Sequence, residues 1–161
     1  MKTLTIGSKD YTLEYSFMAA EHNETVQKMF NVVSGAYLIK RANLTEKNKE
    51  DMAIAMIEGT GEMVADIPHI VKTAFYSGLL ENHGVSEDEA YALMKQYMKE
   101  NKISFKKLFD DIKECMEEDG FFDLSGLTEM MEEMNKNVEE QTKKRTPKTP
   151  QDHKKKSTGT I

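Results

Sequence analysis

The residues of this chain that could take part in metal binding do not recur at the spacings that such chemistry needs. A zinc site requires several converging ligands, often placed by an HExxH helix or by paired CxxC motifs. Neither motif is present. The four histidines lie far apart along the chain: His22, His69, His83 and His153. We therefore predict no metal site and interpret the histidines as surface or loop residues.

One short acidic segment combines a thiol with carboxylates, the groups from which a nucleophile and a general acid can be built. Cys115, the only cysteine, has Glu114, Glu117, Glu118 and Asp119 around it. Negative charges raise the pKa of a thiol, so we expect Cys115 to be unreactive. A run of carboxylates on a helix is usually a solvated face. Because no nucleophile, base and orienting group occur together, the sequence predicts no catalytic site, no cofactor and no enzyme.

Methionine is unusually frequent, with twelve in the chain. Its side chain is flexible and polarizable, which suits surfaces that adapt to a binding partner. Met130, Met131, Met134 and Val138 recur at helical spacing late in the chain. Any helix packed on a core shows the same spacing. Two interpretations of these four residues therefore remain open, a partner-binding surface and an ordinary core stripe.

The N-terminal residues predict a β-hairpin over residues 3–16. Apolar residues alternate with polar ones on both sides of a Gly-Ser-Lys-Asp turn: Leu4, Ile6, Tyr11, Leu13 and Tyr15. Such alternation is typical of two strands that share one apolar face. An isolated hairpin is only marginally stable, so we expect that face to pack on helices.

Apolar residues at helical spacing, preceded by capping residues and followed by glycine, predict several helices. We expect them near 17–33, from Thr45 to about Glu58, from Asp66 through Leu79, after a Ser86–Glu89 capping box, from Ser104 to Asp119 and from Ser125 onward. The segment Ala36–Ile39 is too short to assign. The expected fold class is mainly α, with the short N-terminal β-hairpin packed on a bundle of about five to six helices.

Two glycines decide the expected boundary between the second and third of these helices. Gly59 and Gly61 should weaken or break the helix, because glycine is a poor helix former. The second helix is then expected to bury Met52, Met56 and Ile57. The third is expected to bury a longer stripe: Ile67, Val71, Ala74, Phe75, Gly78 and Leu79.

Charge divides the chain into two parts. The net charge is −6, but residues 143–161 contain seven Lys/Arg and one Asp, whereas the residues before them contain 15 Lys/Arg and 27 Asp/Glu. The basic segment has too few apolar residues to offset the entropy of ordering it. We predict a helical domain over 1–141 with the N-terminal hairpin, and a disordered basic tail over 142–161.

The same patterns limit the compartment and the partners. No run of about 18 apolar residues exists, and the N-terminus lacks a continuous apolar stretch, so we expect a cytosolic protein with no membrane contact. An acidic body repels nucleic acid. Nucleic acid is therefore a disfavoured partner, although the basic tail could touch it.

The chain resembles the tail assembly chaperones of long-tailed, siphovirus-type bacteriophages. The resemblance lies in the order and spacing of three segments that together cover most of residues 1–135. The first runs from Leu4 to Phe17, the second from Asp66 to Glu81, and the third from Val85 to Phe122.

The resemblance implies a non-enzymatic assembly factor. Members of this family bind the tape measure protein, keep it soluble, help recruit the major tail-tube protein, and leave before the virion is finished. It therefore implies a protein of the host cytoplasm that is absent from the mature virion. Many members also have a longer form made by ribosomal frameshift, and Lys154–Lys156 could be encoded by an A-rich slippery site.

Other readings of the sequence remain open. Self-association is one, because several apolar stripes compete for a modest core. A structural tail component retained in the virion is an alternative function. A second alternative is a small regulator that contacts nucleic acid through the basic tail.

Overall fold

The computed structural model describes residues 1–39 and 49–144, and the side chains of residues 1–38 and 51–137 within them. The elements follow in this order: β1 (Lys2–Ile6), β2 (Lys9–Leu13), α1 (Phe17–Glu21), α2 (Asn23–Val33), α3 (Ala36–Ile39), α4 (Lys49–Leu79), α5 (Glu87–Asn101), α6 (Phe105–Glu118), α7 (Phe121–Leu124) and α8 (Leu127–Lys144). The expected class, mainly α with an N-terminal hairpin packed on helices, is confirmed. The predicted tail over 142–161 lies almost entirely outside the described residues.

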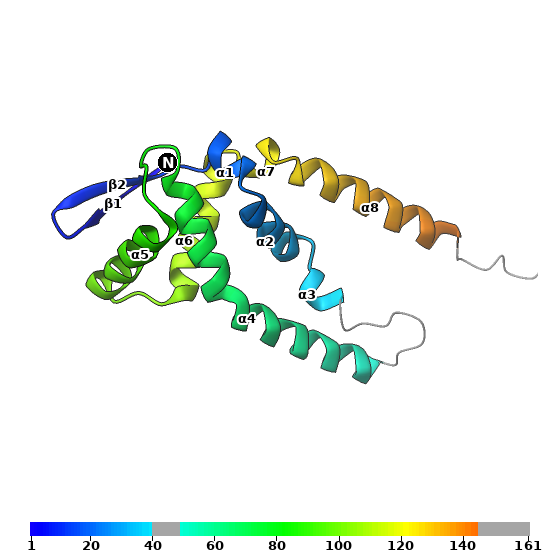
Figure 1. Ribbon diagram of the computed structural model, residues 1–161. Coiled ribbons are helices and arrows are strands. Elements are labelled where there is room, and N and C mark those ends of the chain that lie inside the picture. The colour runs from blue at the N-terminus through cyan, green and yellow to red at the C-terminus, as the bar shows by residue number, and fades with distance from the viewer. Residues whose placement is uncertain (40–48, 145–161) are drawn as a thin grey trace, which may run out of the picture.

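Figure 1 shows how the elements are arranged. The hairpin, α5, α6 and the C-terminal half of α4 make up the body of the molecule. The N-terminal half of α4 and most of α8 extend from this body as two arms, with α2 and α3 between them (Figure 1). Among the helices in the described part of the chain, none is long and apolar enough to span a bilayer.

The predicted hairpin is present, but its turn is shorter than predicted, because Lys9 and Asp10 belong to β2 and only Gly7 and Ser8 connect the strands. β1 and β2 pair antiparallel, with Lys2 opposite Leu13 and Ile6 opposite Lys9. Gly7 has a φ of 63°, a conformation that glycine adopts in tight turns at little cost. The side chains on the inner face are buried: Leu4, Ile6, Leu13 and Tyr15. This face rests on α4, α5 and α6, as expected from its marginal stability alone.

The core lies between α4 and α6. The stripe predicted for the C-terminal half of α4 is buried as expected, including Val71, Phe75 and Leu79. Five residues of α6 meet it: Leu108, Phe109, Ile112, Cys115 and Met116. The capping predictions before α5 and α6 are also confirmed. Ser86 and Glu89 form a capping box, and the Ser104 side chain accepts a hydrogen bond from the Lys107 N–H.

The residues after β2 hold the hairpin between α4 and α6. The Glu14 N–H donates to the Gly78 carbonyl at 2.8 Å, and the Tyr15 N–H donates to Asp119 Oδ2 at 2.9 Å. The Tyr15 ring, fully buried, lies directly on Gly78, where an added Cβ would come within 2.7 Å of it. Close contact of the ring with backbone therefore requires a glycine at this point of α4.

The prediction of one helix over 17–33 is wrong, because the chain bends at His22. His22 has φ −77° and ψ 94°, which ends α1 and begins α2. Its Nδ1 accepts a hydrogen bond from the Thr25 N–H at 3.3 Å, so histidine acts as the N-cap of α2. N-caps are usually Ser, Thr, Asp or Asn, whose side-chain oxygen accepts the hydrogen bond, so a histidine at this position does not indicate the start of a helix.

The predicted break at Gly59 and Gly61 is also wrong. α4 runs without interruption through both glycines and through Pro68. Gly59 lies against the main chain of α3, and an added Cβ would be 2.5 Å from the Tyr37 carbonyl oxygen. Packing of α3 therefore offsets the helix penalty of glycine, which is about 1 kcal/mol. Asp66 is inside the helix and accepts a hydrogen bond from the Tyr37 hydroxyl at 2.5 Å, so it is no N-cap.

The inner face expected near the start of α4 is turned outward. Met52, Met56 and Ile57 are all exposed, whereas Ala55 and Gly59 face α3. The small residues are buried here because the main chain of α3 approaches too closely for larger ones.

The glycine contacts give a test of helix packing. Replacing Gly78 with alanine is expected to lower the free energy of unfolding by about 2 kcal/mol, because the buried Tyr15 ring has little room to move. The measurement is guanidinium unfolding followed by circular dichroism. The matched control is Gly61→Ala, in the same helix with no atom within 4 Å of the new Cβ. In dilute solution the control should gain about 0.5–1 kcal/mol. Equal stability of the two variants would contradict the packing of Tyr15 on Gly78.

Candidate functional site

Two of the three histidines that the structure describes make hydrogen bonds within the fold. His22 caps α2, and the Nε2 of His83 accepts a hydrogen bond from the Thr12 N–H at 2.8 Å. His69 is exposed on α4, and His153 lies outside the described residues. Within the described part of the chain, no group of three His, Cys, Asp or Glu side chains is placed to hold a metal ion.

Cys115 is buried in the core, with 1% of its surface exposed. Burial raises the pKa of its thiol to about 11, with a further contribution from the carboxylate of Asp119. The expected direction of this shift agrees with the structure. The main cause is burial, however, and not the neighbouring carboxylates that the sequence indicates. Asp119 instead binds the hairpin, since it accepts from the Tyr15 N–H and is paired with the Met1 ammonium group.

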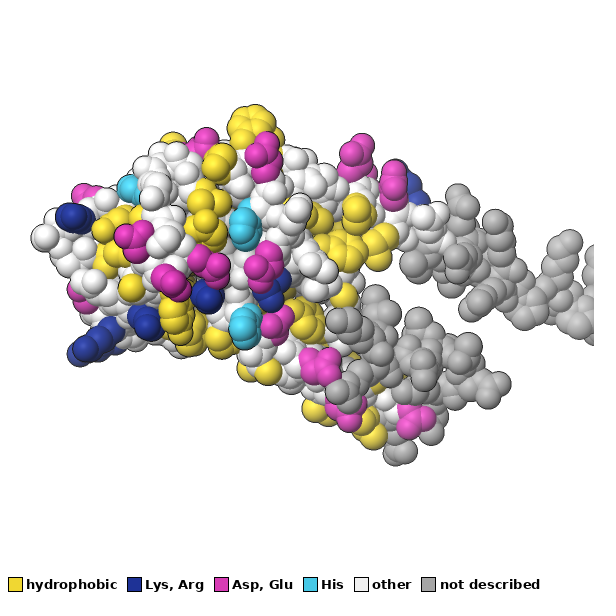
Figure 2. All heavy atoms as spheres, in the orientation of Figure 1, with side chains coloured by type: hydrophobic (Ala, Val, Ile, Leu, Met, Phe, Trp, Pro, Cys, Tyr) yellow, Lys and Arg dark blue, Asp and Glu magenta, His cyan; other side chains and the backbone are white. Residues whose placement is uncertain are grey.

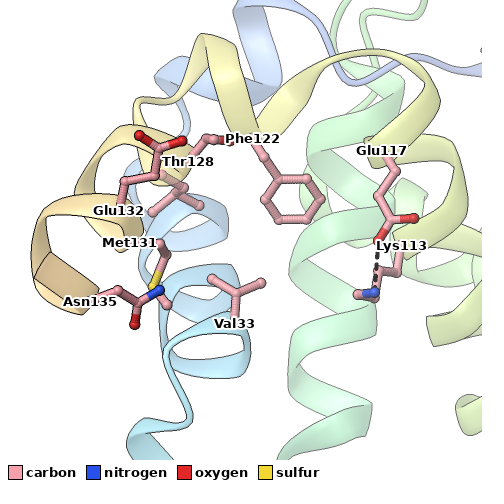
Figure 3. Close-up of a pocket in the computed structure, with 9 residues that line it drawn as sticks. Val33, Lys113, Glu117, Phe122, Thr128, Met131, Glu132 and Asn135 are labelled. Carbon is pink, nitrogen blue, oxygen red and sulfur yellow. Dashed lines mark hydrogen bonds and ion pairs between the residues drawn. The ribbon is translucent and has the colours of Figure 1, made fainter. Parts of the chain in front are cut away.

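An open apolar groove lies where α2, α6, α7 and α8 meet. It has a volume of about 390 Å³. Nine residues line it: Val33, Lys113, Glu117, Phe122, Leu127, Thr128, Met131, Glu132 and Asn135. Figure 3 shows that Val33, Phe122 and Met131 face the same space, with Lys113 and Glu117 on the opposite side. The groove therefore combines an apolar floor with a polar rim.

The two phenylalanines after Gly120 place one ring in the core and the other in the groove. Gly120 has a φ of 75°, which turns the chain at the end of α6, as its sequence predicted. Phe121 is fully buried and meets the Tyr15 ring edge-on, with the ring centroids 6.4 Å apart. Phe122 is held edge-on against Phe121 at 5.5 Å and lines the groove. The core thus fixes the position of the groove ring.

The rim of the groove carries balanced charge. Lys113 and Glu117 form an ion pair of 2.7 Å one helical turn apart on α6 (Figure 3). Glu132 on α8 is paired with Lys136 at 4.0 Å. Exposed pairs of this kind contribute little stability, about 0–1 kcal/mol each. Their long side chains can move, so they can adjust to charges on a bound chain.

Three of the four residues predicted to bind a partner have described side chains, and they differ in exposure and in their position relative to the groove. Met131 lines the groove, beside Leu127. Met130 is exposed and does not line it, and Met134 is half-buried outside it. The side chain of Val138 lies outside the described residues. Of the three whose side chains are described, Met131 alone lines the groove.

α8 begins later than predicted and is only lightly packed. It starts at Leu127 after the short helix α7, which the sequence did not indicate, and Gly126, with a φ of 73°, separates the two. Of the α8 side chains that are described, residues 127–137, only Leu127 is buried. Beyond Leu127, the α8 side chains that line the groove are thus half-buried or exposed within the described part of the chain.

Sequence reasoning missed the groove residues outside α8. Val33, Phe122 and Lys113 belong to three other helices, and their proximity depends on how those helices cross. The adjacent Phe121 and Phe122 carried a signal, because two neighbouring aromatic residues cannot both face one core from a single helical turn.

Comparisons of the chain with protein-family models, with curated proteins and with solved structures found no match. The mainly α class and the groove therefore rest on the geometry described above.

The buried thiol gives a test of the core around α6. At pH 8, a disulfide reagent such as dithionitrobenzoate should modify Cys115 at least 100-fold more slowly in the folded protein than in guanidinium. The reason is that burial excludes the reagent and a pKa of about 11 leaves little thiolate. Modification at the same rate in both states would show that α6 is not packed as described.

Proposed function

We propose that this protein is an assembly chaperone that binds an amphipathic helix of a partner protein in the groove between α2, α6, α7 and α8. The open apolar groove, in which the α8 side chains beyond Leu127 are half-buried or exposed within the described part of the chain, is the observation that carries this proposal. Its volume of about 390 Å³ lies at the low end of the range of about 300–1,000 Å³ typical of small-molecule pockets, so the groove would receive individual side chains of a partner helix.

The lining suits an apolar helix face better than a small polar ligand. Val33, Phe122 and Met131 provide branched, aromatic and flexible apolar surface in one place. A helix laid in such a groove inserts side chains at positions i, i+3, i+4 and i+7. Methionine can repack around different side chains, which lets one groove accept several related helices.

The charge of the chain suits a chaperone for an insoluble partner. Residues 1–142 carry 15 Lys/Arg against 27 Asp/Glu, so a complex would present an acidic surface to solvent. Like-charged complexes repel one another, which opposes aggregation of the apolar partner.

The resemblance to phage tail assembly chaperones indicates which partner to test. By that resemblance the groove would hold part of the long helical tape measure protein, and the complex would then recruit the major tail-tube protein. The protein would act in the host cytoplasm and leave before the virion is complete. It would act by binding alone, without catalysis or a cofactor.

The groove can be tested with two variants that differ by one position. Met131→Glu places a charge among the apolar residues of the groove, whereas Met130→Glu places the same charge on the exposed side of α8. The variants are co-expressed with the tape measure protein of the same genome, and the soluble, co-purifying fraction of that protein is measured. We expect Met131→Glu to reduce that fraction at least tenfold and Met130→Glu to change it less than threefold.

Circular dichroism of the two purified variants must match that of the unchanged protein, so that lost binding is not lost folding. Two results would contradict the proposal. One is a partner that stays insoluble with the unchanged protein. The other is equal binding by both variants, which would place the contact elsewhere. Recovery of the protein in purified virions would contradict the transient role.

A further inference from the structure

The N-terminal half of α4 carries a second apolar surface, separate from the groove. Ile54, Ile57 and Val64 are 55%, 72% and 59% exposed. Gly61 lies between them, with no atom within 4 Å of the position of its missing Cβ. We refer to Ile54, Ile57, Gly61 and Val64 as the α4 seam. None of the groove residues belongs to α4.

The spacing of the α4 seam is that of a helix that packs on another helix. Its residues follow one another at intervals of three, four and three, which is the a/d pattern of a coiled coil. The opposite side of the same turns is already covered, because Ala55 and Gly59 face α3. A helix that is apolar on both sides is normally buried on both sides. Apolar side chains are also visible along the exposed arm of α4 in Figure 2.

We propose that the α4 seam binds the α4 seam of a second copy of this chain, with the two helices antiparallel about a two-fold axis. This arrangement places Ile54 beside Val64 of the second copy, and Ile57 beside Gly61 of the second copy. Gly61 leaves a gap in the surface of the helix, and Ile57 is the most exposed large residue next to it. The seam therefore contains both a projecting side chain and the space that receives it, as a symmetric interface requires.

The antiparallel direction follows from the same features. In a parallel pair Gly61 would lie against Gly61 of the second copy, which leaves a void in the contact. The C-terminal half of α4 is also buried in the body, whereas its N-terminal half extends away from it (Figure 1). Antiparallel helices place the two bodies beyond opposite ends of the seam, where they do not collide.

The residues beside the seam allow two acidic chains to approach. Ala53, Thr60 and Ala65 flank it without charge, and Glu58 is the single charged residue in a flanking position. The Thr60 hydroxyl already donates to the Met56 carbonyl at 2.8 Å, so its burial would leave no unpaired donor.

The size of the seam predicts a weak dimer. From Ile54 to Val64 the helix extends about 15 Å, at a rise of about 1.5 Å per residue. Stable complexes bury about 800 Å² on each partner, more than a contact of this length provides. We therefore expect a dimer that dissociates on dilution through the micromolar range.

Sedimentation equilibrium of the full chain over a range of concentrations tests the dimer. Ile57→Asp should abolish association, because it places a charge in the centre of the seam. The control is Met130→Asp, an equally polar change on the exposed side of α8, which should leave association unchanged. A wild-type chain that stays monomeric to hundreds of micromolar, or equal effects of the two variants, would overturn the proposal.

A second variant distinguishes association through shape complementarity at Gly61 from association through exposed apolar surface alone. Gly61→Leu adds exposed apolar surface and improves helix propensity. If the seam associated only through its hydrophobicity, this variant would dimerise more tightly than the wild type. The proposed fit predicts the opposite, a dissociation constant at least tenfold higher, because leucine fills the space that receives Ile57. Tighter association of Gly61→Leu would overturn the fit.

Cysteine cross-linking tests the direction of the helices. Oxidation should join two copies of the Ile57→Cys/Gly61→Cys variant but not two copies of Ile57→Cys alone. Buried Cys115 does not compete. Cross-linking of Ile57→Cys alone would show a parallel pair and overturn the antiparallel arrangement, whereas efficient joining of the double variant alone would support it.

Discussion

Close packing of the Tyr15 ring on Gly78 is the contact on which the arrangement of the body depends. The ring can lie there only because residue 78 has no Cβ, and the Glu14 N–H bonds to the Gly78 carbonyl beside it. The Tyr15 N–H bonds in turn to Asp119 at the end of α6. The chain after β2 therefore joins the end of α4 to the end of α6, so the hairpin, α4 and α6 are placed together. Tyr15 also meets Phe121, which carries this placement on to α7.

The groove is a consequence of that packing. Phe121 is fixed against Tyr15, and Phe122 then lies at the edge of the core, where its ring lines the groove beside α2 and α8. α8 leaves the body directly after this point, with Leu127 as its buried anchor. A rigid wall formed by α6 and α7 thus faces a lightly packed wall formed by α8. Such a combination is suited to holding a partner helix, because one wall positions it and the other can adjust.

The local elements could be predicted where one residue's chemistry decides the outcome. Alternation of apolar residues sets the two strands, Ser86 and Ser104 cap their helices, and Gly120 supplies the left-handed turn after α6. Predictions were wrong where a neighbouring segment reverses a local preference. Gly59 disfavours a helix by itself, but the close approach of α3 makes glycine the residue that fits at this point of α4. The bend at His22 likewise depends on a side chain that is rarely an N-cap.

The candidate binding surfaces likewise combine features that the sequence predicts with features that depend on the packing of distant helices. The sequence by itself determined that the chain is mainly helical, that a hairpin precedes the helices, and that Met131 lies on an apolar stripe, because these follow from residue type and spacing. Only the tertiary structure decided that Met131 faces Val33 and Phe122, and that Met52, Met56 and Ile57 face outward. Periodicity shows that a helix has an apolar face, but both a core and a partner can cover that face. Which of them does so depends on how distant helices cross, and this is set by contacts between residues far apart in the chain.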